Sequence, residues 1–541
     1  MQHSILVDLP MTTPSEKLAD SLAELRKLQA NGRRVFRSEE LSRLTRERLL
    51  RAGFLKQVLR GWLISSSPTA GEGESTPWYA SFWQFCALYC EARFPDGWHL
   101  SAEQSLFLHA ERTVIPQQVI VYSPSGSNNK IDLLFGTSLY DLKEMQPPPA
   151  EDIVARDGLR VYTVEAAIIK APEAFFAEQP IEAQVALASV REPSGLLRRL
   201  LSGGNSVVAG RLAGAFRRAG RLDIAADISK SMTAAGYSIR ATDPFTTGHV
   251  FANLSPAVAP IIGRIQGVWD ATRDAVLKVF PHAPGLPVER SAYLHFVDDI
   301  YQSDAYHSLS IEGYHVTPDL IERVRSGRWN PESNQADRQS RDALAARGYW
   351  QAFQKVKASV GKIIDGTSPG KLASSAHKDW YLELFQSSVA SGLIEASALA
   401  GYRHDFVFLR TSRYVPPRWE SVRDAMPALF DLLEWETEPA VRAVLGHWLF
   451  GYIHPYMDGN GRMARFLMNA MLASGGYPWT VIRVEDRTRY LRALDSASIE
   501  TDITPFAKLI AERVEWSLSE LKRSRAAVRS SNPQGKRHLH E

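Results

Sequence analysis

The sequence predicts a multidomain, mainly helical protein: an N-terminal winged helix-turn-helix, an α+β domain, and a C-terminal all-α domain that carries a β-hairpin. Three observations support this fold class. The chain of 541 residues is too long for one hydrophobic core. Apolar residues recur at helical spacing through residues 291–522, whereas residues 54–163 hold short alternating runs separated by Gly, Pro and Asn, a pattern typical of strands. Basic residues gather in the N-terminal half, with nine Lys or Arg against three acids both in 31–66 and in 186–240.

Residues 1–66 show the element order of a winged helix-turn-helix, in which three helices are followed by two strands and a turn. Helical spacing of leucines, cap residues before each helix and a Gly between the strands indicate these elements. The expected elements are a helix over 14–30 that Ser15 could cap, a short helix over 38–44, a helix over 46–52 capped by Thr45, and two strands within 54–64.

The basic excess of this unit predicts a polyanionic partner, and the fold favours DNA. A solvated basic face, or a small unit used for protein contacts, would give the same pattern. The basic residues that would contact DNA are Arg46, Arg48 and Arg51 on the third helix, and Lys56 and Arg60 on the wing.

Residues 67–240 are predicted to form an α+β domain with a basic helical end. A loop rich in Ser, Pro and Gly opens this domain, and no catalytic constellation is found in it. The basic helices at its end would either extend a nucleic-acid footprint or form a solvated face. The expected elements are helices over 78–92, 99–110 and 164–171, strands over 114–122, 130–135 and 159–163, and helices through 186–240.

The C-terminal half is expected to begin with linker helices over 241–290, followed by the all-α domain over 291–522 and a basic, disordered tail over 523–541. Within the domain, residues 401–417 read as a β-hairpin closed by two prolines. The first residues show no basic region followed by a long apolar run, and no run of eighteen apolar residues occurs, so we expect a soluble, cytoplasmic protein without a signal peptide or a membrane partner.

Residues 454–465, His-Pro-Tyr-Met-Asp-Gly-Asn-Gly-Arg-Met-Ala-Arg, hold the residues that predict chemistry. Helical patterns flank them, so the segment should be a loop that runs into a helix N-terminus, where unpaired N–H groups favour an anion. Arg462 and Arg465 share a helix face and suit phosphate oxygens. Asp458 is an oxygen ligand suited to Mg²⁺ beside phosphates, and His454 can accept a proton near neutral pH. Phosphoryl or nucleotidyl transfer needs this combination.

This segment resembles the signature of Fic-domain proteins, His-x-Phe-x-Asp/Glu-Gly-Asn-Gly-Arg-x-x-Arg, with Tyr456 in place of the Phe. The resemblance implies an all-α Fic domain and protein adenylylation: transfer of AMP from ATP to a Ser, Thr or Tyr hydroxyl of a target protein, or of the chain itself. It implies His454 as the base and Asp458 as the ligand of Mg²⁺. The residues expected at ATP are Gly459, Asn460, Gly461, Arg462 and Arg465 at the phosphates, and Tyr490 near the adenine.

Residues 305–316 contain a second match, because Ser308-Leu-Ser-Ile-Glu312-Gly313 resembles the inhibitory motif of Fic proteins. The resemblance implies that Glu312 pairs with Arg465 and takes the place of the γ-phosphate, so that ATP binds unproductively. In such proteins a flap before the catalytic helices aligns the target by strand addition. The residues expected at its exposed edge, called the docking edge below, are Arg410, Thr411, Ser412, Arg413 and Tyr414.

Other readings stay open. The N-terminal half resembles, more weakly, the winged helix of AbiEi-type antitoxins, which repress transcription. The chain could therefore be a DNA-binding regulator or a toxin-antitoxin-like protein, whose Fic half senses nucleotide or transfers another phosphate-linked group. Removal of AMP, with Glu312 positioning water, and a homodimer are also compatible with the sequence.

Overall fold

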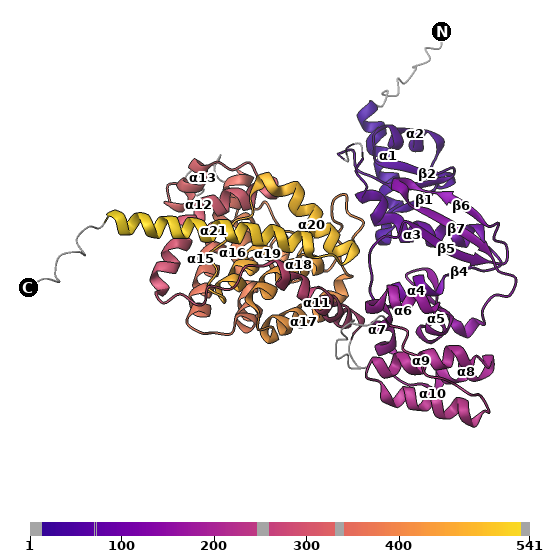
Figure 1. Cartoon of the computed structure of the whole chain (residues 1–541). Helices are drawn as coiled ribbons and strands as arrows, with labels where there is room; N and C mark the ends of the chain where they lie inside the picture. The colour runs from indigo at the N-terminus through magenta and orange to yellow at the C-terminus, as the bar shows by residue number, and fades with distance from the viewer. Residues whose placement is uncertain (1–12, 70, 72, 246–258, 330–339, 532–541) are drawn as a thin grey trace, which may run out of the picture.

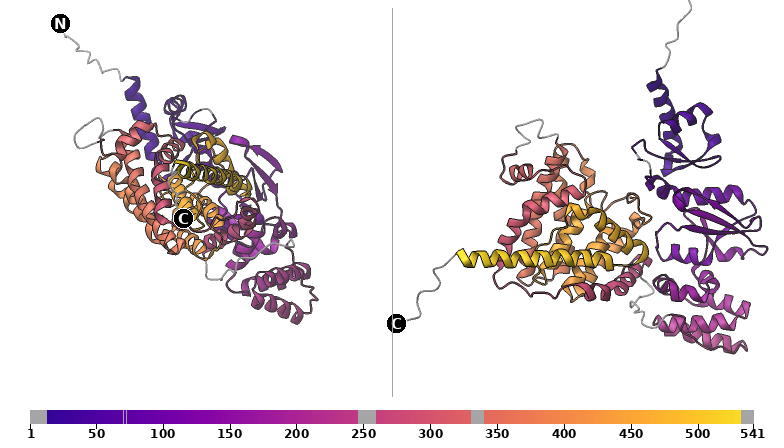
Figure 2. Two further views of the ribbon diagram at one scale, coloured as in Figure 1. Left: turned by 60° about the vertical axis from the view of Figure 1, so that its left-hand side comes forward. Right: turned by 45° about the horizontal axis from the view of Figure 1, so that its top comes forward.

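The computed structural model describes residues 13–69, 71, 73–245, 259–329 and 340–531. Its N-terminal half is an elongated stack, with residues 13–65 at one end, a four-stranded sheet in the middle and the helices of residues 194–234 at the other end (Figure 1). The C-terminal helices form a second body beside this stack, as two further views confirm (Figure 2). Within the described residues, no helix is both long enough and apolar enough to cross a membrane.

The first unit contains a three-stranded antiparallel sheet in the order β1-β3-β2, with two helices packed on it. Two expectations for this unit are wrong in detail. Thr13, not Ser15, caps the first helix, because its hydroxyl accepts from the Glu16 N–H and Glu16 accepts from the Thr13 N–H. One α-helix and a single 3₁₀ turn replace the second and third helices, because Ser42 caps a helix that already includes Thr45. The elements are α1 (Pro14–Leu28), β1 (Val35–Arg37), a 3₁₀ turn (Ser38–Glu40), α2 (Arg43–Arg51), β2 (Leu55–Leu59) and β3 (Trp62–Ser65).

The second unit is α+β, as predicted, with a mixed sheet in the order β4-β5-β7-β6. Strands β5 and β7 are parallel. Sequence reasoning missed β7 because its Asp141 breaks the apolar alternation; this carboxylate is buried and accepts from the Ser127 and Asn129 N–H groups at 2.8 and 3.0 Å. The elements are α3 (Thr76–Arg93), β4 (His99–Leu100), α4 (Ala102–His109), β5 (Gln118–Ser123), β6 (Asn129–Asp132), β7 (Ser138–Lys143), β8 (Ile153–Arg156) and β9 (Leu159–Tyr162).

Six helices complete the N-terminal half around their own hydrophobic core. Their arginines serve this fold: Arg199 pairs with Asp152 at 2.7 Å, and Arg211 and Arg221 donate to the buried carbonyl groups of Ala171 and Val190. These contacts support a structural role for the three residues, whereas Arg198, Arg217 and Arg218 are exposed. The helices are α5 (Val164–Lys170), α6 (Glu173–Glu178), α7 (Pro180–Ser189), α8 (Ser194–Gly203), α9 (Ser206–Arg218) and α10 (Leu222–Ala234).

The C-terminal body is built around two central helices, α18 and α19, whose residues are almost all buried. Helix α11 was expected to be a linker, but its Ile261, Ile265 and Val268 belong to the same hydrophobic core. Helix α21 continues to Ser531, so residues 523–531 are helical rather than disordered; residues 532–541 lie outside the described residues. The helices are α11 (Pro260–Val279), α12 (Arg290–Ile311), α13 (Pro318–Arg325), α15 (Arg341–Ile364), α16 (Pro369–Ala390), α17 (Val422–Trp435), α18 (Pro439–Ile453), α19 (Asn460–Ala473), α20 (Arg487–Glu500) and α21 (Thr504–Ser531).

The segment 401–417, expected as a β-hairpin, forms no strand. It closes instead around the buried side chain of Arg403, which donates to the carbonyl groups of Asp405 and Pro417. The Arg403 guanidinium donates to carbonyl groups that a pairing strand would otherwise satisfy. The segment therefore keeps its turned shape without backbone pairing to itself. It is called the flap loop below.

Candidate active site

The loop between α18 and α19 folds as the motif predicts. His454 ends α18 with φ at 52°, and Gly459 precedes α19 with φ at 82°, a left-handed conformation that suits glycine. The amide of Asn460 closes the loop, since it accepts from the Tyr456 N–H at 2.9 Å and donates to the Tyr456 carbonyl at 2.8 Å. The Asn460 side chain therefore shapes the loop, and its expected place at the phosphates through the loop and the helix N-terminus stays a prediction.

His454 is held in one tautomer at the end of α18. Its Nδ1 lies 3.3 Å from the Gly451 carbonyl, which can only accept, so Nδ1 carries the proton and Nε2 is left as the acceptor. Burial lowers the pKa of His454 to about 4, and the nearby charge of Arg403 acts in the same direction. The imidazole is therefore neutral at pH 7 and able to take a proton from a hydroxyl.

Arg403 is a positioning residue that sequence reasoning missed. Its Nε donates to the His454 carbonyl at 2.8 Å, and its backbone N–H donates to the Pro455 carbonyl at 2.8 Å. Burial lowers the pKa of this guanidinium to about 10, so it stays charged at neutral pH. No motif marks Arg403, because it lies 51 residues before His454 and binds main-chain oxygens.

Two buried guanidinium groups line α19. Arg465 donates to the Ser308 hydroxyl at 2.8 Å and to the Glu312 carboxylate at 2.7 Å. Arg462 lies between the rings of Tyr314 and Phe385, with its central carbon 5.2 and 4.9 Å from their centroids. The Nε of Arg462 and one Nη of Arg465 are buried and have no partner among the described residues. Unsatisfied donors on two fixed cations favour an anion with several oxygens.

The carboxylate of Glu312 lies at the N-terminus of α19. A Cβ added to Gly461 would meet its Oε1 at 2.2 Å, so only glycine leaves room for this oxygen. Burial opposes the charged form of Glu312, but the charges of Arg465 and Arg462 outweigh it and hold the pKa below its usual value. Glu312 caps α12, and Gly313 turns the chain away with φ at 84°. An internal anion thus lies where the motif predicts an external one.

Asp458 faces the solvent near this anion position, with 62% of its side chain exposed. Its carboxylate accepts from the Gly459 N–H at 2.6 Å and lies 3.5 Å from Arg462. Together with Arg462 it lines a cavity of about 250 Å³. Within the described residues no three potential metal ligands cluster. One exposed carboxylate beside a phosphate position fits Mg²⁺, which is commonly bound through one or two carboxylates and substrate phosphates.

Tyr490 and Tyr456 are both buried. Tyr490, expected near the adenine, is 2% exposed, and its hydroxyl lies 2.8 Å from His447 in the core. It does not line the cavity beside Asp458. The ring of Tyr456 stacks on Tyr381 with centroids 3.7 Å apart, as a Phe would, while its buried hydroxyl has no partner among the described residues.

The docking edge is contacted by the N-terminal half, although Arg410 and Thr411 stay exposed. Arg410 pairs with Glu74 of the N-terminal half at 2.7 Å, and the Arg413 carbonyl accepts from the Ile115 N–H at 2.9 Å. Thr411 is exposed and its N–H donates to Thr76. Ser412 and Tyr414 are buried, and they donate to Asp495 and to the Tyr452 carbonyl. The expected exposure therefore holds for Arg410 and Thr411, whereas Ser412 and Tyr414 are buried.

The DNA-contact candidates divide into two groups. The guanidinium of Arg46 donates to the Ser38 carbonyl, that of Arg48 donates to the Lys17 carbonyl and the Ser21 hydroxyl, and Lys56 lies over the ring of Phe135. These three stabilise the N-terminal half itself. Arg51 and Arg60 are exposed.

Comparisons with known proteins find similarity to Fic proteins. Residues 376–472 match the model of the Fic/DOC family. The protein adenylyltransferase Fic of Nematostella vectensis is 42% identical over 121 residues, which is 22% of this chain and 28% of that protein. The protein of the same name from Drosophila yakuba is 28% identical over 269 residues, 48% of this chain and 49% of that protein. A solved structure of Fic-1 (residues 134–508) from C. elegans aligns with 65% of this chain and 100% of its own, at 16% identity and a TM-score of 0.37. The chain spans less than half the length of these curated relatives.

Proposed function

We propose that this chain, which contains a Fic domain, is a protein adenylyltransferase that transfers AMP from ATP to a protein hydroxyl. One observation carries the proposal: a neutral imidazole with a free Nε2, two buried guanidinium groups with unpaired donors, and a helix N-terminus meet in one site. Curated relatives with this domain are named protein adenylyltransferase Fic. The acceptor is a hydroxyl on a target protein or on the chain itself.

Each residue of the site has a separate role in the proposed reaction. His454 Nε2 takes the proton of the acceptor hydroxyl as its oxygen attacks the α-phosphorus of ATP. The bond from the α-phosphorus to the bridging oxygen breaks, and pyrophosphate leaves with both bonding electrons. Arg462 and Arg465 hold the β- and γ-phosphates, and the N–H groups at the start of α19 face the same charge. Asp458 would hold Mg²⁺, which neutralises charge on the phosphates when bound.

The same geometry supports autoinhibition by Glu312. Its carboxylate takes the Arg465 donor that a γ-phosphate needs, at 2.7 Å. ATP with its three phosphates would have to displace this carboxylate or bind with its γ-phosphate elsewhere. For this reason we expect the unaltered chain to transfer AMP slowly.

Mass spectrometry of the purified chain after incubation with Mg²⁺ and each nucleoside triphosphate tests the proposal. Glu312→Gly should gain the mass of AMP with ATP, and Glu312→Gly combined with His454→Ala should gain none. Another added mass would identify a different transferred group, which remains the alternative, because the loop contacts phosphates rather than the base. Equal labelling with and without His454 would reject the assignment of the base.

The strand order β1-β3-β2 beside α2 supports a second proposal, that residues 13–65 form a winged helix that binds DNA. The two exposed candidates make the test specific. Arg51→Ala with Arg60→Ala should weaken binding to the chain's own upstream DNA and flatten its salt dependence. Glu47→Gln, which removes a negative charge nearby, should not weaken DNA binding. Binding that is absent, or independent of salt, would remove this proposal.

A further inference from the structure

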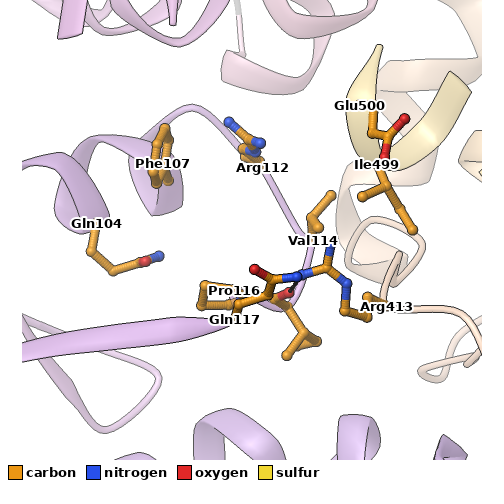
Figure 3. A pocket seen from close by; sticks show the side chains of 10 residues that line it. Gln104, Phe107, Arg112, Val114, Pro116, Gln117, Arg413, Ile499 and Glu500 are labelled. Atoms are coloured by element: carbon orange, nitrogen blue, oxygen red, sulfur yellow. Dashed lines mark hydrogen bonds between the residues drawn. The ribbon is translucent and has the colours of Figure 1, made fainter. Parts of the chain in front are cut away.

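Two segments far apart in the sequence lie antiparallel beside the active site. Thr113 faces Val415, to whose carbonyl its hydroxyl donates, and Ile115 faces Arg413. The Ile115 N–H donates to the Arg413 carbonyl at 2.9 Å, and the Arg413 guanidinium donates back to the Ile115 carbonyl at 3.3 Å. Figure 3 shows Val114 and Pro116 of this segment beside Arg413, where the N-terminal half meets the C-terminal body. One main-chain hydrogen bond joins the two segments, as in an extended peptide bound through its backbone, and two side-chain donors complete the pairing.

Contacts on both sides hold this pairing in place. On one side Arg410 pairs with Glu74 at 2.7 Å, and the Thr411 N–H donates to the Thr76 hydroxyl at 3.3 Å. On the other side Arg418 pairs with Asp157 at 2.9 Å. Glu74 and Asp157 both belong to the N-terminal half, so that half holds the flap loop at Arg410 and Thr411 and holds the chain directly after the loop at Arg418.

The clamped loop is joined directly to the catalytic base. Arg403 donates both to the Pro417 carbonyl of the flap loop and to the His454 carbonyl. The Tyr414 hydroxyl donates to the Tyr452 carbonyl at 2.7 Å, two residues before His454. A peptide bound along residues 411–415 would therefore lie on a loop that is fixed to the main chain of the catalytic base.

We infer that residues 113–115 are an internal occupant of the docking edge, and that a protein target binds as an extended segment by displacing them. The inference rests on the proposed function and names the target's chemistry: an unfolded or loop segment with free backbone N–H and C=O groups and a hydroxyl side chain. A cavity of about 350 Å³ beside the pairing, lined by Phe107, Arg112 and Glu500 among others, gives room for the side chains of the displacing segment.

The test uses the full chain in the Glu312→Gly background, labelled ATP with Mg²⁺, and dephosphorylated β-casein as a disordered, hydroxyl-rich acceptor. Thr113→Val removes the donor to Val415, and Glu74→Gln removes the charge that holds Arg410. Together they should raise casein labelling about fivefold, the value of one hydrogen bond and one exposed ion pair. Glu47→Gln is the matched control, since it breaks exposed pairs with Arg43 and Arg51 in the same half without touching the flap loop. It should leave labelling unchanged.

Hydrogen exchange at the Ile115 amide separates the possible failures. It should be slow in the starting protein and faster in the double variant, with unchanged circular dichroism. If exchange remains slow, Ile115→Pro, which has no N–H, replaces the double variant. Faster exchange without faster casein labelling would overturn the inference, and so would fast exchange in the starting protein. If Glu312→Gly labels no protein at all, the proposed function fails instead, whatever the exchange rate shows.

Discussion

The contact between Glu312 and Arg465 provides the sharpest test of the active site. Glu312→Gly removes the carboxylate from the N-terminus of α19 and frees one N–H of Arg465. Arg465 keeps its bonds to the hydroxyl and carbonyl of Ser308, at 2.8 and 3.1 Å. The substitution therefore frees the phosphate-binding donor without releasing the guanidinium from its place.

The expected gain follows from the exposure of the pair. A hydrogen bond between two charged groups contributes about 1.5–3 kcal/mol when it is buried. Arg465 is buried, but 32% of the Glu312 side chain is exposed, so solvent screens part of this value. About 1–2 kcal/mol remains, which corresponds to about a 5- to 30-fold rise in the rate of AMP transfer at low ATP. Glu312→Gln keeps an acceptor for Arg465 but loses the charge, so its transfer rate should lie between those of the starting protein and Glu312→Gly.

The assay compares initial rates of labelled AMP transfer and the ATP dissociation constant measured by calorimetry. Glu322→Gln on α13 is the control, since it breaks an exposed pair with Arg325 and should change neither value. Unchanged transfer in Glu312→Gly, with ATP bound as tightly as in the starting protein, would refute the claim that Glu312 competes with the γ-phosphate. A gain that survives Arg465→Ala would refute the claim that it acts through Arg465.

Three further predictions follow from buried charges. Arg403→Ala should lower the transfer rate about tenfold or more in the Glu312→Gly background and leave ATP affinity unchanged, because Arg403 positions His454 and touches no phosphate; a loss of ATP affinity alone would contradict this. Burial raises the pKa of Asp304 to about 6, so the folded chain loses stability as pH rises from about 4 to 6. Asp304→Asn should therefore raise the free energy of unfolding by about 2–3 kcal/mol at pH 8 but leave it unchanged at pH 4. Chemical denaturation at both pH values checks this prediction. The imidazole resonance of His454, assigned by its loss in His454→Ala, should not titrate between pH 5.5 and 8, since its pKa is lowered to about 4; an NMR midpoint near 6.5 would show that the imidazole is not buried as described.

The catalytic loop was predictable because its geometry is local. Gly459 must adopt a left-handed conformation, and Arg462 and Arg465 lie on one face of any helix that begins at Asn460. Glu312 lies 153 residues away from Arg465, yet its motif carried enough information to predict their contact, which the structure contains. The contacts of Asn460 within the loop and of Tyr490 with His447 could not be predicted, because the motif gives the positions of side chains but not the direction in which they point.

Non-local contacts explain what sequence reasoning missed. The flap loop alternates like a hairpin, but whether its edge pairs with itself or with residues 113–115 depends on a segment about 300 residues away. The basic arginines of the N-terminal half look like a nucleic-acid footprint until their partners are known. Arg48, Arg211 and Arg221 each donate to a backbone carbonyl of their own half, which no charge count can reveal.

The two internal blocks act on different substrates. Glu312 comes from the end of α12 and takes the position of a phosphate, whereas residues 113–115 come from the N-terminal half and take the position of a polypeptide. Because no partner is shared between them among the described contacts, their effects on transfer to a protein should multiply. Glu312→Gly alone should then favour self-modification at exposed hydroxyl groups, and only the variant that also carries Thr113→Val and Glu74→Gln should turn the activity toward added protein. If Glu312 were the single block, Thr113→Val with Glu74→Gln would leave casein labelling unchanged. The ratio of casein labelling to self-labelling therefore distinguishes one block from two.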